Sequence, residues 1–176
     1  MKLLTIDTKS SCYVIDANEM NHLQQNVASS LTLEKGTFDL QITSGRYSYA
    51  QSKTEGEPLV VLWIYGVDGS TFINKNTGHE TGATWTTLNG YNKKLQLEVK
   101  DRAVICALFF DLNNTDNTGE INLLISSNKP FFNPQTITVD SKKNCYILDE
   151  KVLSTLKQPN SNFIELELIK LKRLRT

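Results

Sequence analysis

The sequence predicts an all-β fold, a β-sandwich or jelly roll with two short helices. Strand-like stretches alternate with turn residues at intervals of about 8–12 residues, which is the spacing of such folds. The 176 residues include 18 Thr and 16 Asn, which suit strands joined by tight turns. Outside two short segments, the apolar residues show no sustained helical period.

Individual strands are recognised by their patterns. Segments 37–43 and 95–99 alternate apolar with polar residues and predict half-buried strands. Segments 59–65 and 104–110 are apolar on both faces and predict two separate central strands. The pair Lys35-Gly36 predicts a turn before the strand that contains Phe38.

The chain also contains an internal repeat. Residues 5–25 and 138–158 are identical at 8 of 21 positions, including a Cys-Tyr pair flanked by Asp. Each copy predicts a strand through the Cys-Tyr pair and then a short helix. Asp16 and Asp149 stand where they would accept hydrogen bonds from the first amides of those helices.

The repeat divides the chain into a sandwich module, residues 1–135, and a partial second copy of its N-terminal strand–helix–strand segment, residues 136–176. Three explanations of the second copy stay open. It completes the same sheet, it pairs with another chain, or the natural protein is longer. The second explanation predicts self-association through open sheet edges.

The charge and the absence of targeting patterns in the sequence argue against several functional classes. Nineteen basic and nineteen acidic residues give a formal net charge of zero, which argues against a nucleic-acid-binding protein. No apolar run reaches the roughly 18 residues of a membrane span. The N-terminus lacks a secretory leader pattern, and three cysteines without Cys-x-x-Cys spacing argue against disulfides, so we expect a cytoplasmic protein.

Signatures of catalysis are scarce. The sequence has no nucleophile elbow, Walker loop or dinucleotide-binding glycine motif, and its two histidines stand outside known catalytic patterns. We expect a non-enzymatic protein. Of the histidines, His22 is expected on the surface of a short helix, and His79 is a loop residue that we regard as a candidate ligand contact.

One loop concentrates oxygen ligands. The segment Asp111 to Glu120 connects two apolar strands and carries carboxylates, side-chain amides and hydroxyls, including Thr115, Asp116 and Asn117. Ca²⁺ takes six to eight oxygen ligands in a tolerant geometry, which such a loop can supply. The alternative is an ordinary turn in which Asn and Asp side chains bond to their own backbone.

The same loop resembles the calcium loop of the bacterial galactophilic lectins, a family of small β-sandwiches that bind galactosides through Ca²⁺. Asp111 and Thr115 match the family pattern in spacing, and Asp116-Asn117-Thr118-Gly119 resembles its Asn-Asn-small-Gly end, two residues early. The resemblance implies that Tyr49 lends its backbone carbonyl to the metal. The family's galactose-holding segment has no counterpart between Tyr49 and Pro58, so the resemblance implies the fold more than the sugar.

The leading hypothesis is therefore a lectin-like binding module that recognises carbohydrate with a Ca²⁺ site formed by Asp111, Thr115, Asp116, Asn117 and Tyr49. Trp85 and Tyr47 are candidate aromatic platforms for the ligand. The alternative hypothesis is a structural module that assembles through its partial repeat and open sheet edges.

Overall fold

The computed structural model describes residues 3–9, 11–49 and 55–148, which belong to two units. Residues 17–148 form a mostly antiparallel β-sheet with one short helix, so the all-β class is confirmed. The remaining described residues, 3–9 and 11–16, contain no helix or strand. In the described part of the chain, no helix combines the length and the apolar character needed to cross a membrane.

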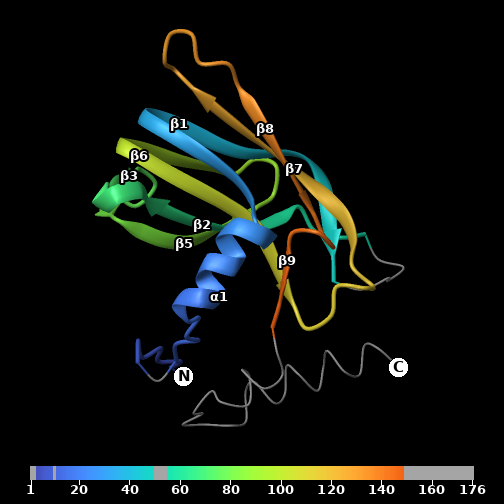
Figure 1. Cartoon of the computed structure of the whole chain (residues 1–176). Coiled ribbons are helices and arrows are strands. Elements are labelled where there is room, and N and C mark those ends of the chain that lie inside the picture. Colours follow the sequence, from blue (N-terminus) through green and yellow to red (C-terminus); the bar gives the residue numbers. More distant parts are fainter. Residues whose placement is uncertain (1–2, 10, 50–54, 149–176) are drawn as a thin grey trace. The chain divides into compact units, whose positions relative to one another are not determined.

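The elements follow one another along the chain as Figure 1 shows. A helix, α1 (Ala17–His22), runs directly into a π-helical turn, η1 (Leu23–Val27), and a 3₁₀ turn, η2 (Val67–Gly69), follows the second strand. The strands are β1 (Ser29–Ser48), β2 (Leu59–Gly66), β3 (Phe72–Asn74), β4 (His79–Thr81), β5 (Ala83–Asn89), β6 (Lys94–Asp111), β7 (Thr118–Ser127), β8 (Gln135–Asp140) and β9 (Cys145–Ile147).

Two long strands organise the sheet, and each changes partners along its length. Over most of its length β1 pairs with β6, and from Phe38 to its end it also pairs with β7. On its other side β6 pairs with β3 near its beginning and with β2 from Ala103 onward. Strand β8 extends the sheet beyond β7, β5 lies beyond β2, and β9 pairs in parallel with the end of β6.

A bulge lies where the sequence predicted that strands would begin or end. The pairing of β1 with β6 shifts register between Glu34 and Gly36, opposite the exposed, charged segment 100–102. The predicted turn at Lys35-Gly36 is therefore wrong, because β1 continues through it while β6 accommodates one extra residue on the opposite side. The two strands expected at 95–99 and 104–110 are likewise one strand, β6.

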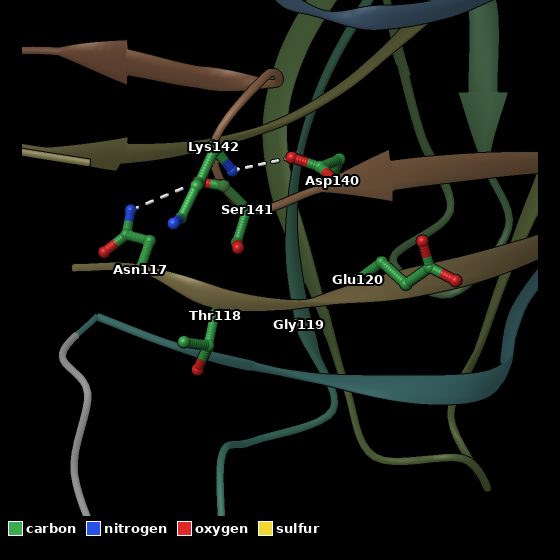
Figure 2. A pocket seen from close by; sticks show the side chains of 7 residues that line it. All are labelled: Asn117, Thr118, Gly119, Glu120, Asp140, Ser141 and Lys142. Carbon is green, nitrogen blue, oxygen red and sulfur yellow. Dashed lines mark hydrogen bonds between the residues drawn. The ribbon is translucent and has the colours of Figure 1, made fainter. Parts of the chain in front are cut away.

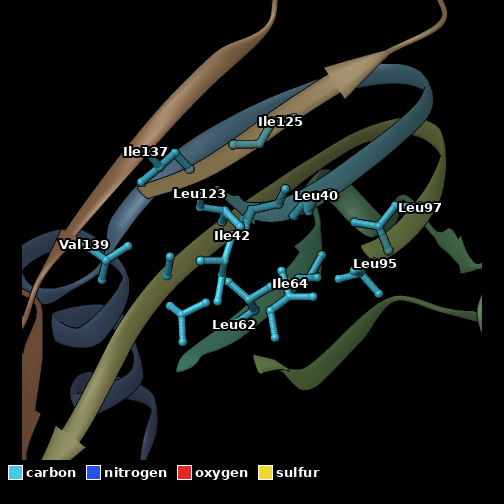
Figure 3. Close-up of a cluster of buried hydrophobic side chains, with 14 of the residues drawn as sticks. Leu40, Ile42, Leu62, Ile64, Leu95, Leu97, Leu123, Ile125, Ile137 and Val139 are labelled. Carbon is cyan, nitrogen blue, oxygen red and sulfur yellow. The ribbon is translucent and has the colours of Figure 1, made fainter. Parts of the chain in front are cut away.

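The buried faces of these strands enclose one hydrophobic core. Figure 3 shows Leu62 and Ile64 of β2 gathered with Ile42 of β1, and these three side chains have 0% exposure. Leu123 of β7 and Val139 of β8 are also fully buried in the same cluster. Because successive side chains of a strand point to opposite faces, the alternate side chains of β2 and β5 face outward.

The first copy of the repeat is partly as expected. The helix expected after Asp16 begins at Ala17 and is confirmed. The strand expected at Cys12–Ile15 is absent, whereas the matching segment Cys145–Ile147 forms β9. Strand β9 forms because the end of β6 supplies it with backbone hydrogen bonds. The helix expected after Asp149 lies outside the described residues.

Strands β1 and β7 approach closely at two glycines. Gly45 of β1 has φ +93° and Gly119 of β7 has φ +92°, and a Cβ on either would overlap a carbonyl oxygen of the opposite strand. Both positions therefore need glycine for its left-handed φ and for the space.

We predict that Gly45→Ala destabilises the fold far more than Gly78→Ala. Gly78 shares a positive φ of +72° but has open space where a Cβ would go, so its cost is backbone strain of about 1–2 kcal/mol. Urea unfolding of both variants measures the difference in the free energy of unfolding. Equal losses would show that the close approach of β1 and β7 contributes nothing.

Candidate functional site

An aromatic strip lies on the outer face of strands β2, β5 and β6. Trp63 of β2 stands opposite Trp85 of β5 on one side and Cys106 of β6 on the other. The Trp63 and Trp85 ring centroids are 4.9 Å apart, and those of Trp63 and Tyr65 are 6.2 Å apart. Phe110 continues the strip at 5.6 Å from Trp85. We call these four rings, Trp63, Tyr65, Trp85 and Phe110, the aromatic strip.

The aromatic strip is partly open to solvent. Trp85 is 40% exposed, and the other three rings are half-buried. The Trp63 indole Nε1 is buried and has no hydrogen-bond partner among the described residues. Large aromatic surface that stays accessible on a sheet face marks a place where a protein binds something. Trp85 was predicted as a ligand residue from the sequence, and the structure adds its three neighbours.

The strip ends beside the helical segment. Phe110 lies 5.8 Å, centroid to centroid, from the nearly buried ring of Tyr146 in β9. Tyr146 in turn lies 6.5 Å from the ring of His22 at the end of α1. Asn144 fixes this region by donating from Nδ2 to the carbonyl of Val27, at 2.7 Å. The aromatic strip is therefore exposed to solvent at Trp85 of β5, whereas its other end, Phe110, packs against Tyr146 of β9.

The predicted calcium residues come together in part, at the end of β6. Asp111 is 8% exposed and Asn117 is fully buried. Burial is the main cause that raises the pKa of the Tyr49 phenol, and the nearby charge of Asp111 raises it further. The structure brings Asp111, Asn117 and Tyr49 into one neighbourhood, and the calcium site itself stays a prediction.

Two oxygens at this end are buried without a partner among the described residues: Asp116 Oδ1 and Asn117 Oδ1. Asn117 uses its Nδ2 to donate to the carbonyl of Ser141, at 3.1 Å. Asp111 Oδ1 accepts from the amide of Leu112, at 2.6 Å. These are hard oxygen atoms of the kind that Ca²⁺ takes, so the donor chemistry fits, although six to eight ligands would require further carbonyls or water.

Other features of the loop favour an ordinary turn. Thr115 donates from both its amide and its hydroxyl to Asn113 Oδ1, at 3.1 and 2.9 Å, which is the local bonding of an Asx turn. No cluster of three or more His, Cys, Asp or Glu side chains suited to a metal occurs among the residues that the structure describes. The bonds of Thr115 agree with the ordinary-turn interpretation, and the calcium interpretation stays a prediction.

Cys145 lies beside the predicted calcium residues, although the sequence analysis noted it only as part of the internal repeat. Its thiol is 6% exposed and accepts from Asn117 Nδ2 at 3.7 Å. Burial raises its pKa to about 12, the charge of Asp111 adds to the rise, and the Asn117 hydrogen bond opposes it. No local pattern indicates this contact, because the parallel pairing of β9 with β6 is what brings Cys145 near Asp111.

Two predicted ligand residues lie elsewhere. Tyr47 is 2% exposed, with its ring stacked on Phe109 at 3.9 Å and edge-on to Tyr49 at 4.4 Å, so it packs in the core rather than offering a platform. Burial chiefly raises the pKa of its phenol. His79 is exposed in β4, which β3 separates from the beginning of β6, whereas Asp111 ends β6.

A surface hollow of about 430 Å³ lies next to Asn117, between the beginning of β7 and the end of β8 (Figure 2). Asp140 stands directly opposite Glu120 across these strands. Its Oδ1 accepts from the amides of Lys143 and Lys142, at 2.8 and 2.9 Å, and these bonds lower its pKa. This carboxylate therefore holds the turn between β8 and β9.

Comparison with protein-family models, with curated proteins and with solved structures gives no match. The arguments for function therefore rest on the site itself.

We predict that one of the three thiols reacts rapidly in the native protein. Cys12 is exposed, whereas Cys106 and Cys145 are buried and burial raises the pKa of both. A disulfide reagent at pH 8 should titrate one thiol quickly and the other two only after unfolding, since the thiolate is the reactive form. Rapid reaction of two thiols in the folded protein would contradict this packing.

Proposed function

We propose that this protein is a non-enzymatic, lectin-like module that binds carbohydrate on the aromatic strip. The observation that carries the proposal is the set of four neighbouring rings on an outer sheet face, with Trp85 40% exposed. The apolar C–H groups of a sugar ring pack against the electron-rich face of an aromatic ring. The side-chain amide of Asn89, on the same face of the same strand, supplies a polar group close by.

Charge and architecture agree with this proposal. The formal net charge is zero, which suits a neutral ligand. We regard the sheet as two layers of a β-sandwich, because β1 and β6 each contribute to two groups of strands around one core. In this proposal the segment 136–176 is a partial repeat whose first two strands, β8 and β9, complete the sheet.

We predict that Trp85→Ala lowers glycan affinity at least tenfold, because the most exposed ring of the strip is lost. A glycan array identifies the ligand, and titration calorimetry measures the affinity of each variant. The matched control is Phe131→Ala, which removes a fully exposed ring outside the strip and should leave affinity unchanged. Absence of any glycan binding by the wild-type protein would refute the proposal, as would equal binding by the Trp85 variant.

Calcium is a separate part of the proposal. When bound, Ca²⁺ would supply positive charge and open coordination positions for sugar hydroxyls. Asp111, Asp116 and Asn117 would hold it through side-chain oxygens, of which Asp116 Oδ1 and Asn117 Oδ1 are buried without a partner among the described residues. The Tyr49 phenol lies close enough to Asp111 for that charge to raise its pKa, which keeps Tyr49 a candidate contributor to the site.

We predict that titration with Ca²⁺ gives heat with the wild-type protein and much less with Asp111→Asn, which keeps the shape and removes the charge. Asp140→Asn is the control, since this carboxylate bonds to backbone amides of a different turn. If the wild-type protein shows neither heat nor a shift in Tm with Ca²⁺, the loop is an ordinary turn. Sugar binding that survives a chelator would then assign recognition to the aromatic strip alone.

A further inference from the structure

Strand β5 leaves one long side of its backbone open. It pairs with β2 along its whole length, from Ala83 to Asn89. No described residue pairs with its other side. An exposed strand edge presents a row of amides and carbonyls that can accept another strand.

The hydrogen bonds at its two ends show which groups are open. Gly66 donates to the carbonyl of Gly82 and Gly90 donates to that of Pro58, both at 2.8 Å and both in the register of the β2–β5 ladder. Because bonded and non-bonded pairs alternate in an antiparallel ladder, the even-numbered residues of β5 bond to β2. The odd-numbered residues direct their backbone groups away from β2: Ala83, Trp85, Thr87 and Asn89.

The first of these four positions is already occupied. Ala83 donates to the hydroxyl of Thr81 at 3.3 Å, and that hydroxyl donates to the carbonyl of Ala83 at 2.9 Å. The amides of Trp85, Thr87 and Asn89 have no backbone partner among the described residues. The open stretch is therefore centred on Thr87.

The β5 edge also lacks the devices that usually protect an edge strand. Residues 83–89 include no charged side chain and no proline. By contrast, the edge strand β8 ends in Asp140, and the short β4 carries His79 and Glu80. Lysine, proline or a bulge is the common way to prevent edge pairing, so the neutral β5 edge is permissive.

We propose that a second copy of this chain pairs with β5 across a two-fold axis at Thr87. A two-fold axis perpendicular to the sheet places an edge antiparallel to itself, so the same groups serve both copies. Thr87 then faces Thr87 of the second copy, and Trp85 faces its Asn89. This register uses the open amides of Trp85, Thr87 and Asn89 and leaves the bonds of Ala83 with Thr81 intact. The Trp85 carbonyl accepts from the Thr84 hydroxyl at 3.3 Å and keeps a second lone pair for the partner strand.

Self-pairing suits this edge better than pairing with a charged peptide. The seven residues bring no like charges together across the axis. Thr87 and Trp85 side chains are exposed on the outer face and gain cross-strand neighbours. If the aromatic strip binds carbohydrate as proposed above, pairing places two strips on one continuous face, and a ligand with repeating units engages both.

The test uses the full chain and two substitutions at Thr87. Thr87→Pro removes an amide that points away from β2, so the β2–β5 ladder of the monomer is kept while the edge loses a donor. Thr87→Lys places like charges opposite each other across the axis. The matched control is Thr136→Lys, an exposed position on the other long edge strand, β8.

Sedimentation velocity over a hundredfold range of concentration measures the mass, and circular dichroism checks the fold. We expect the wild type and Thr136→Lys to reach twice the chain mass, and both Thr87 variants to remain monomers at least tenfold higher in concentration. Should Thr87→Pro fail to fold, Thr87→Lys decides, and added salt should partly restore its dimer.

Three outcomes overturn the proposal: a wild-type protein that is monomeric throughout, a dimer that survives both Thr87 variants, or a dimer that Thr136→Lys abolishes. Affinity for a monosaccharide, measured on Thr87→Lys, keeps the two proposals apart. If Thr87→Lys is a monomer and keeps its affinity for the monosaccharide, the binding function does not depend on the dimer. If Trp85→Ala loses that affinity and keeps the dimer mass, the loss concerns the aromatic strip alone.

Discussion

The antiparallel pairing of β1 with β6 is the interaction on which the rest of the structure depends. These strands of 20 and 18 residues carry partners on both sides, so every other strand is placed directly or indirectly by one of them. The bulge between Glu34 and Gly36 lets both strands bend together without ending. The sheet can then enclose a single core from several directions, while the outward side chains of β2 and β5 remain available for recognition.

The polar cluster around Asp111 and the aromatic strip both lie near places where a strand has few described strand neighbours. At the end of β6, the described part of the chain adds the three-residue β9, which brings Cys145 beside Asp111 and Asn117. At β5 the sheet stops, and Trp85 and Trp63 lie on its outer face near the open edge. Asp111 and Asn117 of the polar cluster are buried, whereas the aromatic strip is exposed at Trp85, so the strip is the better candidate to meet a large ligand.

The sequence predicted the class of fold and the interiors of the main strands, because burial on one or both faces imposes a pattern that is visible in the chain. It failed where pairing overrides local signals. Lys35-Gly36 is typical of a turn, yet the chain continues because β6 supplies bonds on both sides of the bulge. Cys12 and Cys145 share a sequence context, yet only the second forms a strand among the described residues. Trp63 and Tyr65 were hidden within a run that is apolar on both faces, so their outward direction became visible only from the register with β5 and β6.

The central claim is that recognition occurs on the outer face of β2, β5 and β6. Its most direct test is a heteronuclear NMR titration of the full chain with the glycan that binds best on an array. The account predicts that the indole signals of Trp63 and Trp85 shift first, together with backbone amides of 61–65 and 83–87. Shifts confined to the segment 111–120 and Tyr49, with both indole signals unchanged, would contradict it.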